Sequence, residues 1–319
     1  MRLSLFLFYW GRQNLERLLR HLSPETKKGY IYATLAYVGW GFFPIYWKLL
    51  LKVPAVEILS HRIIWGFVFY FLYSVLKNRN FSLFLPPTRR EAQRLTLAAI
   101  VIMLNWFVYV YAVNSGQIVE SSLGYFINPL VNILVGMLFL KETLTPMQKS
   151  AALMATLGVA VITYDKGTLP WIALFLAGSF SLYGLLKRSV TAAGERSNLY
   201  ETSILLPLTL IFQMYWIRAG HSPVVDPTLT VSDGYLLVIL IGGGIITGLP
   251  LIFFAEAAKR IPFYMLGFFQ FFAPSLQFLS GVVIFDEPIS RVTFLGFLFI
   301  WLAGTLLIMN NFIRIRRKN

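Results

Sequence analysis

Three ionisable residues, Glu57, His61 and Arg62, lie close together in an otherwise apolar stretch of the chain. Glu57 and His61 are four positions apart, so a helix would place both on one face. There they could relay a proton or clamp a substrate, because ionisable groups at membrane depth are costly and usually functional. The alternative is that Glu57 caps the positive end of its helix, with His61 and Arg62 paired to it. Capping is favoured, since Glu57 and a later acid, Glu201, each lie within one turn of an expected helix start.

A second group of candidate residues combines amides with aromatic side chains. Asn105 and Tyr109 share a helical face, and Trp106 flanks them. An amide among aromatic rings suits a partly apolar organic substrate. A hydrogen bond between neighbouring helices explains Asn105 equally well, and such a bond typically contributes under about 1 kcal/mol.

Polar and proline positions recur along the chain at a nearly constant spacing. Three pairs are separated by 145 residues: Pro129 and Pro274, Gly136 and Gly281, and Glu142 and Glu287. Two polar pairs share that spacing: Tyr125 with Gln270, and Asn132 with Gln277. Two further pairs are 144 and 143 residues apart: Glu57 with Glu201, and Trp40 with Tyr183. The spacing predicts a duplicated unit.

These patterns predict three groups of functional residues. A substrate cavity is expected to be lined by Trp40, Asn105, Tyr109, Tyr125, Asn128, Asn132, Tyr183, Gln270 and Gln277. Pro129 and Pro274 are expected to break or hinge their helices, because proline removes a backbone hydrogen bond. Glu142 and Glu287, at the charged ends of their spans, are expected to be structural anchors, because a charge costs less at the membrane interface than at the midplane.

The composition is that of an integral membrane protein. The chain is 57% hydrophobic and 13% charged, with a mean hydropathy of +0.67, whereas soluble domains are about a quarter charged. Its long continuous apolar runs favour helices over a barrel. The net charge of +14 comes from short basic clusters between these runs, so we expect no nucleic-acid partner. The sequence has no nucleotide-binding or catalytic motif, no cysteine and only 3 histidines, and we expect neither an enzyme nor a cofactor.

Ten membrane spans are predicted to follow an N-terminal extension. They cover residues 30–51, 54–76, 95–115, 119–140, 147–164, 168–187, 199–218, 234–256, 262–285 and 292–313. The basic extension, residues 1–29, contains an amphipathic stretch that fits a helix on the membrane surface, and residues 314–319 form a basic tail. Residues 30–164 and 168–313 would be two five-helix repeats.

The basic residues indicate how the spans are oriented. With ten spans, 22 of the 28 Lys and Arg residues fall on the side of both termini and 5 on the other, while Arg62 lies inside a span. By the positive-inside rule, both termini are cytoplasmic. Because five spans is an odd number, the second repeat must be inverted relative to the first, as in many secondary transporters.

These motifs resemble those of a known family. Asn128-Pro129 followed by Glu142, and Ala273-Pro274 followed by Glu287, are similar to the signature of the EamA-type permeases in the drug/metabolite transporter superfamily. Glu57-Ile-Leu-Ser-His61-Arg62 resembles the RarD branch of that family more closely. The resemblance begins near Lys28 and continues to the C-terminus. It implies ten helices, a bacterial inner membrane, and export or exchange of small organic molecules.

The predicted function is therefore secondary-active transport of a small organic metabolite or drug by alternating access. One alternative is a membrane receptor or regulator that kept the fold, with the N-terminal extension docking a partner. Another is a translocase of lipid precursors, which would need a laterally open cavity. Expected partners are a small-molecule substrate, membrane lipid and, if transport is coupled, protons carried through Glu57, His61 and Arg62; the protein is expected to be a monomer or homodimer.

Overall fold

The structure is a computed structural model that describes residues 23–78, 88–140, 144–188, 190, 194–222, 231–261 and 269–316. Most of the predicted N-terminal extension, the anchor Glu142 and the end of the C-terminal tail lie outside these residues.

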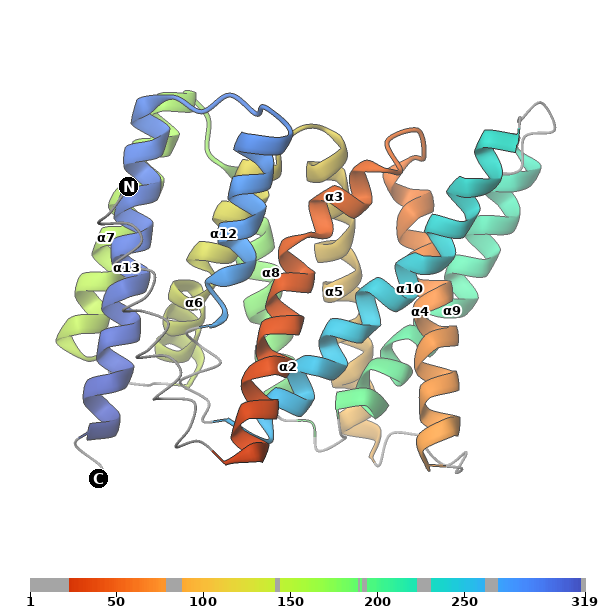
Figure 1. The fold of residues 1–319 in the computed structure, drawn as a ribbon, viewed down its shortest axis with the longest axis horizontal. Helices are drawn as coiled ribbons and strands as arrows, with labels where there is room; N and C mark the ends of the chain where they lie inside the picture. Colours follow the sequence, from red (N-terminus) through yellow and green to blue (C-terminus); the bar gives the residue numbers. More distant parts are fainter. Residues whose placement is uncertain are drawn as a thin grey trace, which may run out of the picture.

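Every regular element in the described part of the chain is a helix, which confirms the all-α class. The helices are α2 (Pro24–Gly41), α3 (Phe43–Lys48), α4 (Ala55–Asn78), α5 (Arg89–Asn114), α6 (Ile118–Leu140), α7 (Pro146–Lys166), α8 (Trp171–Arg188), α9 (Gly194–Arg218), α10 (Val231–Ala258), α12 (Phe272–Leu279), the π-helical η2 (Ser280–Ile284) and α13 (Arg291–Arg316). From α4 to α10, each helix runs opposite to the one before it (Figure 1).

The first predicted span is two helices rather than one, and Pro44 explains the break. Phe42 ends α2, and its backbone N–H bonds the carbonyls of Val38 and Gly39 at 3.1 and 3.2 Å. Pro44, in the first turn of α3, has no N–H to bond the Trp40 carbonyl four residues earlier. The amide of Gln277 on α12 donates to that free carbonyl at 3.0 Å instead. Gln277 therefore completes a broken helix, a role that the sequence spacing did not predict.

Four described helices are long and apolar enough to cross a membrane, judged by length and composition. They span Ala55–Leu76, Arg89–Asn114, Gly234–Ala258 and Arg291–Asn310, and the shorter apolar helices are Trp171–Lys187 and Phe272–Ile284. Large apolar side chains are also exposed on other helices, among them Leu153 of α7 and Ile211 of α9. In a multi-pass membrane protein, such surface faces lipid rather than water.

The helices pack in a small number of extensive pairs. α7 packs on α13, α6 on α8, α2 on α10, α5 on α8, and α4 on both α9 and α10 (Figure 1). α7 and α13 approach closely because glycines face each other across the contact. A Cβ atom added at Gly158 would lie 2.7 Å from the backbone oxygen of Gly296, and one at Gly296 would lie 2.9 Å from the oxygen of Gly158. Small residues at such a contact let two membrane helices pack backbone to backbone.

We predict that Gly158→Ala lowers the melting temperature of the detergent-solubilised protein. The new methyl group would meet backbone, so the two helices must separate, at a cost of about 1–3 kcal/mol. Gly178→Ala on α8 is the matched control, because nothing lies within 4 Å of an added Cβ there, and alanine stabilises a helix by about 0.5–1 kcal/mol relative to glycine. Equal melting temperatures for the two variants would contradict the close contact.

Candidate functional site

Arg62 of α4 lies in the interior of the helix bundle, with 4% of its surface exposed. Its guanidinium carbon is 4.2 Å from the ring centre of Trp106 on α5, 5.3 Å from that of Trp47 and 5.8 Å from that of Phe43, both on α3. Three helices therefore position this cation. Cation–π contacts of this kind stabilise a guanidinium without neutralising its charge.

Several groups around Arg62 are hydrogen-bond donors that lack an acceptor. The Nε and one Nη of Arg62, the Nε1 of Trp47 and the hydroxyl of Tyr109 are buried and have no partner within the described residues. The Tyr109 ring lies 5.7 Å from that of Tyr125. Tyr109 belongs to the same hydrophobic cluster as Trp47 and Phe43, and Tyr125 packs against that cluster. The site thus combines one cation, aromatic walls and unused donors.

Glu57 and His61 form a separate group that Gln213 of α9 joins. The amide nitrogen of Gln213 is 3.3 Å from Glu57 Oε1 and 3.3 Å from His61 Nε2. The hydroxyl of Ser222 donates to the same carboxylate oxygen, and Trp65 Nε1 donates to His61 Nδ1 at 3.2 Å. Glu57 is fully buried. The structure therefore brings Glu57 and His61 together, as their spacing predicts.

The expected pairing of Glu57 with Arg62 is wrong. Successive residues on a helix point about 100° apart because one turn takes 3.6 residues. His61 faces α9, whereas Arg62 faces the rings of α3 and α5. The expected position of Glu57 near the helix start is confirmed: it lies in the first turn of α4, where negative charge is stabilising, and its carboxylate is bound by the side chains of Gln213 and Ser222.

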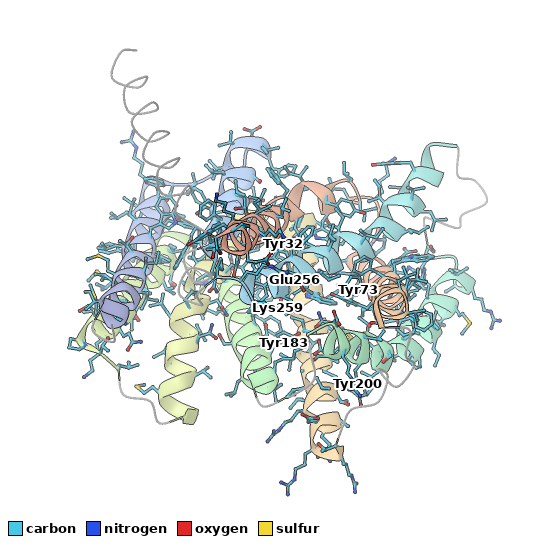
Figure 2. The ribbon with its side chains drawn as sticks, turned by 60° about the horizontal axis from the view of Figure 1, so that its bottom comes forward. Tyr32, Tyr73, Tyr183, Tyr200, Glu256 and Lys259 are labelled. Atoms are coloured by element: carbon cyan, nitrogen blue, oxygen red, sulfur yellow. The ribbon has the colours of Figure 1, made fainter. Side chains whose placement is uncertain are left out.

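Glu201 belongs to a buried network with Tyr183 and Lys187. Lys187 Nζ lies 2.5 Å from Glu201 Oε1, and the Tyr183 hydroxyl donates to Oε2 at 3.0 Å. Because α9 begins at Gly194, about two turns before Glu201, the expected capping role of Glu201 is wrong. Tyr183 lies in the central part of the molecule in Figure 2, which brings the bottom of Figure 1 forward.

A small cavity separates this network from the aromatic neighbours of Arg62. Tyr70 and Trp106 line one part of it, and Tyr183, Asn198 and Glu201 line another. Its volume of about 20 Å³ leaves room for roughly one water molecule. Of the predicted cavity residues, only Tyr183 lines this space.

Three of the predicted amides gather at one point. Asn128 of α6 accepts hydrogen bonds at its Oδ1 from Asn132 at 3.2 Å and from Gln270 at 3.4 Å. Its own amide nitrogen donates to the Ala177 carbonyl and the Ser181 hydroxyl of α8, both at 3.1 Å. Two segments related by the 145-residue spacing therefore meet through polar groups, and a pathway lined by them stays a prediction.

Asn105 serves helix packing rather than a cavity. Its amide nitrogen donates to the Leu176 carbonyl at 3.0 Å and to the Ser179 hydroxyl at 2.8 Å, both on α8. Both donors of the amide are thereby used, and the residue is 1% exposed. Of the two interpretations open from the sequence, the structure favours the interhelical hydrogen bond. Trp40, whose carbonyl binds Gln277, packs its ring against Tyr37.

The two prolines differ in their local structure. α6 continues through Pro129, so the expected break is absent there. Pro274 lies in the first turn of α12. Backbone N–H groups in the first turn have no acceptor within the helix, so a proline there removes no helical hydrogen bond. A hinge function for either proline remains a prediction.

Glu287 and Glu120 hold the ends of other helices. The Glu287 carboxylate accepts the backbone N–H groups of Ile118 and Val119 at 2.7 and 2.8 Å, at the start of α6. Glu120 accepts the N–H of Ile172, at the start of α8, at 3.1 Å, and pairs with Lys166 at 2.7 Å. Negative charge at a helix start is stabilising because the unpaired N–H groups there carry partial positive charge.

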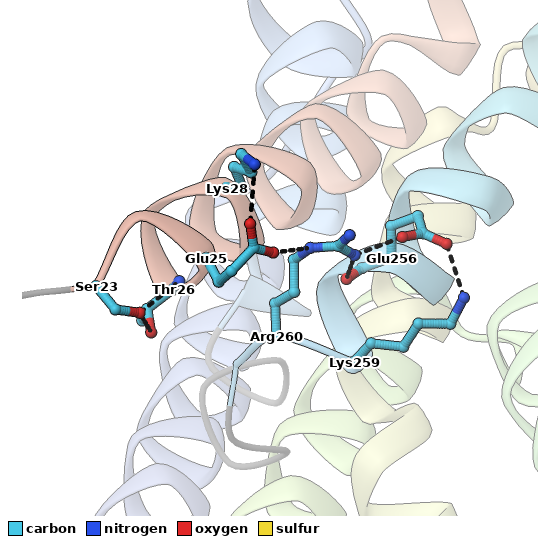
Figure 3. A network of polar contacts seen from close by, with 7 residues as sticks. All are labelled: Ser23, Glu25, Thr26, Lys28, Glu256, Lys259 and Arg260. Carbon is cyan, nitrogen blue, oxygen red and sulfur yellow. Dashed lines mark hydrogen bonds and ion pairs between the residues drawn. The ribbon is translucent and has the colours of Figure 1, made fainter.

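A network of charges joins α2 to the end of α10 (Figure 3). Arg260 Nε lies 3.0 Å from Glu25, and its Nη1 binds Glu256. Lys28 lies 2.8 Å from Glu25, and Lys259 lies 2.7 Å from Glu256. Hydrogen bonds from Lys28 and Arg260 hold the pKa of Glu25 below its usual value. Glu256, Lys259 and Arg260 are neighbours in the sequence, whereas the contact of Arg260 with Glu25 joins residues 235 positions apart.

Sequence reasoning missed the partners of the buried charges. Gln213 and Ser222 are far from Glu57 in sequence, and no spacing rule connects them. Trp47, on α3, is 1% exposed and lies in the protein interior.

Comparison with known proteins places these features in context. A family model described as the EamA-like transporter family matches residues 27–164. Uncharacterized transporter YojE of Bacillus subtilis strain 168 is 41% identical over 284 residues, covering 88% of this chain and 93% of that protein. Protein RarD of Escherichia coli strain K12 is 38% identical over 298 residues, covering 93% of this chain and 99% of the relative. One solved crystal structure has a TM-score of 0.56 at 17% identity, covering 88% of this chain and 96% of its own, which indicates a shared fold.

We predict that Glu287→Ala destabilises the protein by about 1–2 kcal/mol, the usual effect of losing a helix cap. Two backbone N–H groups of α6 lose their acceptor. Asp286→Asn is the matched control: Asp286 is exposed and has a φ of 49°, a conformation that asparagine also tolerates. Thermal unfolding of both variants in detergent provides the measurement, and a Glu287→Ala protein as stable as the control would refute the anchoring role.

Proposed function

The chain belongs to the EamA-like transporter family, and from this premise we propose that it moves a small organic solute by alternating access of two inverted five-helix halves. The halves are residues 30–164 and 168–313, and the family match at 27–164 supports the first. The protein resides in a bacterial inner membrane with both termini in the cytoplasm, because its basic residues divide 22 to 5 between the two sides.

The observation that carries this proposal is a contact that recurs at the two ends of the α7–α13 pair. Thr145, which caps α7, lies 2.9 Å from Asn310 near the end of α13. Ser290, just before α13, donates to Asp165 near the end of α7. Thr145 and Ser290 are 145 residues apart, and so are Asp165 and Asn310. A two-fold axis in the membrane plane would exchange these contacts.

The buried faces of the same two helices agree with that axis. The buried residues of α7 are Ala151, Ala155, Gly158 and Ile162. The positions 145 residues later are Gly296, Ile300, Ala303 and Leu307, all buried on α13. Other packing pairs exchange in the same way: α6–α8 corresponds to α12–α2, α2–α10 to α8–α5, and α4–α10 to α9–α5. This agreement supports two halves built alike and inserted in opposite directions.

Proton coupling is assigned to Glu57 and His61. The two side chains both contact the amide nitrogen of Gln213, so a change in the protonation of either one alters the hydrogen bonding of the other. Glu57 also keeps one buried carboxylate oxygen, Oε2, without a partner in the described structure, which leaves it free to take up a proton.

The proposal is tested with the purified full-length protein in liposomes. Uptake of labelled amino acids, organic acids, amines and neutral drugs is followed with and without a pH gradient. We expect at least one solute to move faster than in protein-free vesicles, with a rate that saturates. If no solute moves under either condition, the proposed function is wrong.

We predict that Glu57→Gln reduces pH-driven uptake to the rate measured without a gradient. Glutamine keeps the size and the hydrogen-bonding capacity of the side chain but cannot exchange a proton. Solute exchange without a gradient should continue, because it needs no proton. Asp286→Asn, which removes an exposed carboxylate, is the control and should leave both rates unchanged. If the Glu57→Gln variant still takes up solute faster with a pH gradient than without one, Glu57 has only a structural role.

A further inference from the structure

The charge of Arg62 has no counterion in the described structure. Two buried acids of α4 and α9 have other partners: Glu57 is bound by Gln213 and Ser222, and Glu201 pairs with Lys187. A buried guanidinium costs more when it is left unpaired than when it is paired and hydrogen-bonded. Aromatic contacts reduce that cost only partly. The site therefore lacks a negative charge.

The buried hydrogen-bond donors at and beside Arg62 indicate the chemistry of the ligand that would bind them. Arg62 offers donors in a planar fork and cannot accept a hydrogen bond, and the indole of Trp47 is likewise a donor only. Together with the Tyr109 hydroxyl, these groups need an acceptor with at least two oxygens. A carboxylate matches the guanidinium fork with two parallel hydrogen bonds.

The walls of the site define the rest of the ligand. Trp106, Trp47 and Phe43 surround the guanidinium, and Tyr109 and Tyr125 lie edge to face beside it. Apolar and aromatic walls with a few convergent polar groups are typical of sites for small organic molecules. An inorganic anion would gain nothing from these rings.

We propose that Arg62 binds the carboxylate of an organic anion whose apolar body packs between Trp106, Trp47 and Tyr109. This inference rests on the proposed function, because it names the chemical class of the solute. It differs from the proton-coupling role of Glu57 and His61, which face another helix.

The test uses three probes that share a phenyl ring and are of similar size but carry a negative, no or a positive charge: phenylacetate, phenylacetamide and phenethylammonium. Each is added to the full-length protein in detergent at about 10 mM, roughly ten times a weak Kd of about 1 mM. Thermal unfolding and tryptophan emission are recorded, since two tryptophans contact Arg62. We expect phenylacetate alone to raise the melting temperature and change the emission, with saturation. Equal responses to the amide or the ammonium probe, or no response to phenylacetate, would overturn the proposal.

Arg62→Gln should weaken phenylacetate binding about 10- to 100-fold, the usual effect of losing hydrogen bonds to a charged group. Arg62→Lys keeps the charge without the fork and should bind with intermediate affinity. Arg291→Gln, at an exposed arginine, is the control and should bind normally. Unchanged binding by Arg62→Gln refutes the assignment. If that variant does not fold, the comparison of the three probes on the unmodified protein still tests whether the site binds a carboxylate.

Two further arms separate the possible outcomes. Chloride or inorganic phosphate that alone gives the full response would show an inorganic anion site and overturn the organic-anion assignment. Liposome flux distinguishes this inference from the proposed function. If amines or neutral solutes are transported and Arg62→Gln does not change their flux, the proposed transport function is supported and the organic-anion site is refuted. If phenylacetate binds in an Arg62-dependent way but no solute is transported, the organic-anion site is supported and the proposed transport function is refuted.

Discussion

A charged or polar group inside a membrane protein has to find its partner within the protein, because the surrounding hydrocarbon offers none. Most interior contacts of this chain follow from that constraint. Glu57 is bound by Gln213, and Glu201 by Lys187. Asn128 directs its amide nitrogen to a backbone carbonyl and a serine of α8. Arg62 departs from the rule, since aromatic rings surround it. Its unpaired donors are the basis on which we propose a ligand there.

The same constraint acts on the backbone where helices begin and break. Gln277 binds the carbonyl that Pro44 leaves free, and Glu287 binds the first N–H groups of α6. These contacts join α2 to α12 and α6 to the segment after η2, so each ties together helices far apart in sequence. At the other side of the membrane, exposed charges join α2 to α10 (Figure 3). Exposed ion pairs contribute little stability, so this second connection opens more readily than the buried ones.

Helix positions were largely predictable because a membrane span is a local property of the sequence. Eight of the ten predicted spans correspond to single helices, from α4 to α10 and α13. The first span was mispredicted at Pro44, whose effect on the helix depends on local geometry rather than on hydropathy. Of the site, the pairing of Glu57 with His61 followed from their spacing on one helix. The placement of Arg62 and Asn105 did not, because it depends on which neighbouring helix each side chain faces.

The sequence by itself determined the membrane class, the helices, the 145-residue spacing and the family resemblance, since each is carried by composition or by residues at fixed separations. The tertiary structure alone decided which polar groups meet. It placed Gln213 between Glu57 and His61, assigned Asn105 to helix packing, and left Arg62 among rings with no counterion from the described residues. The physical reason is that spacing along one helix fixes the face on which a residue lies, whereas its partner depends on how the helices pack.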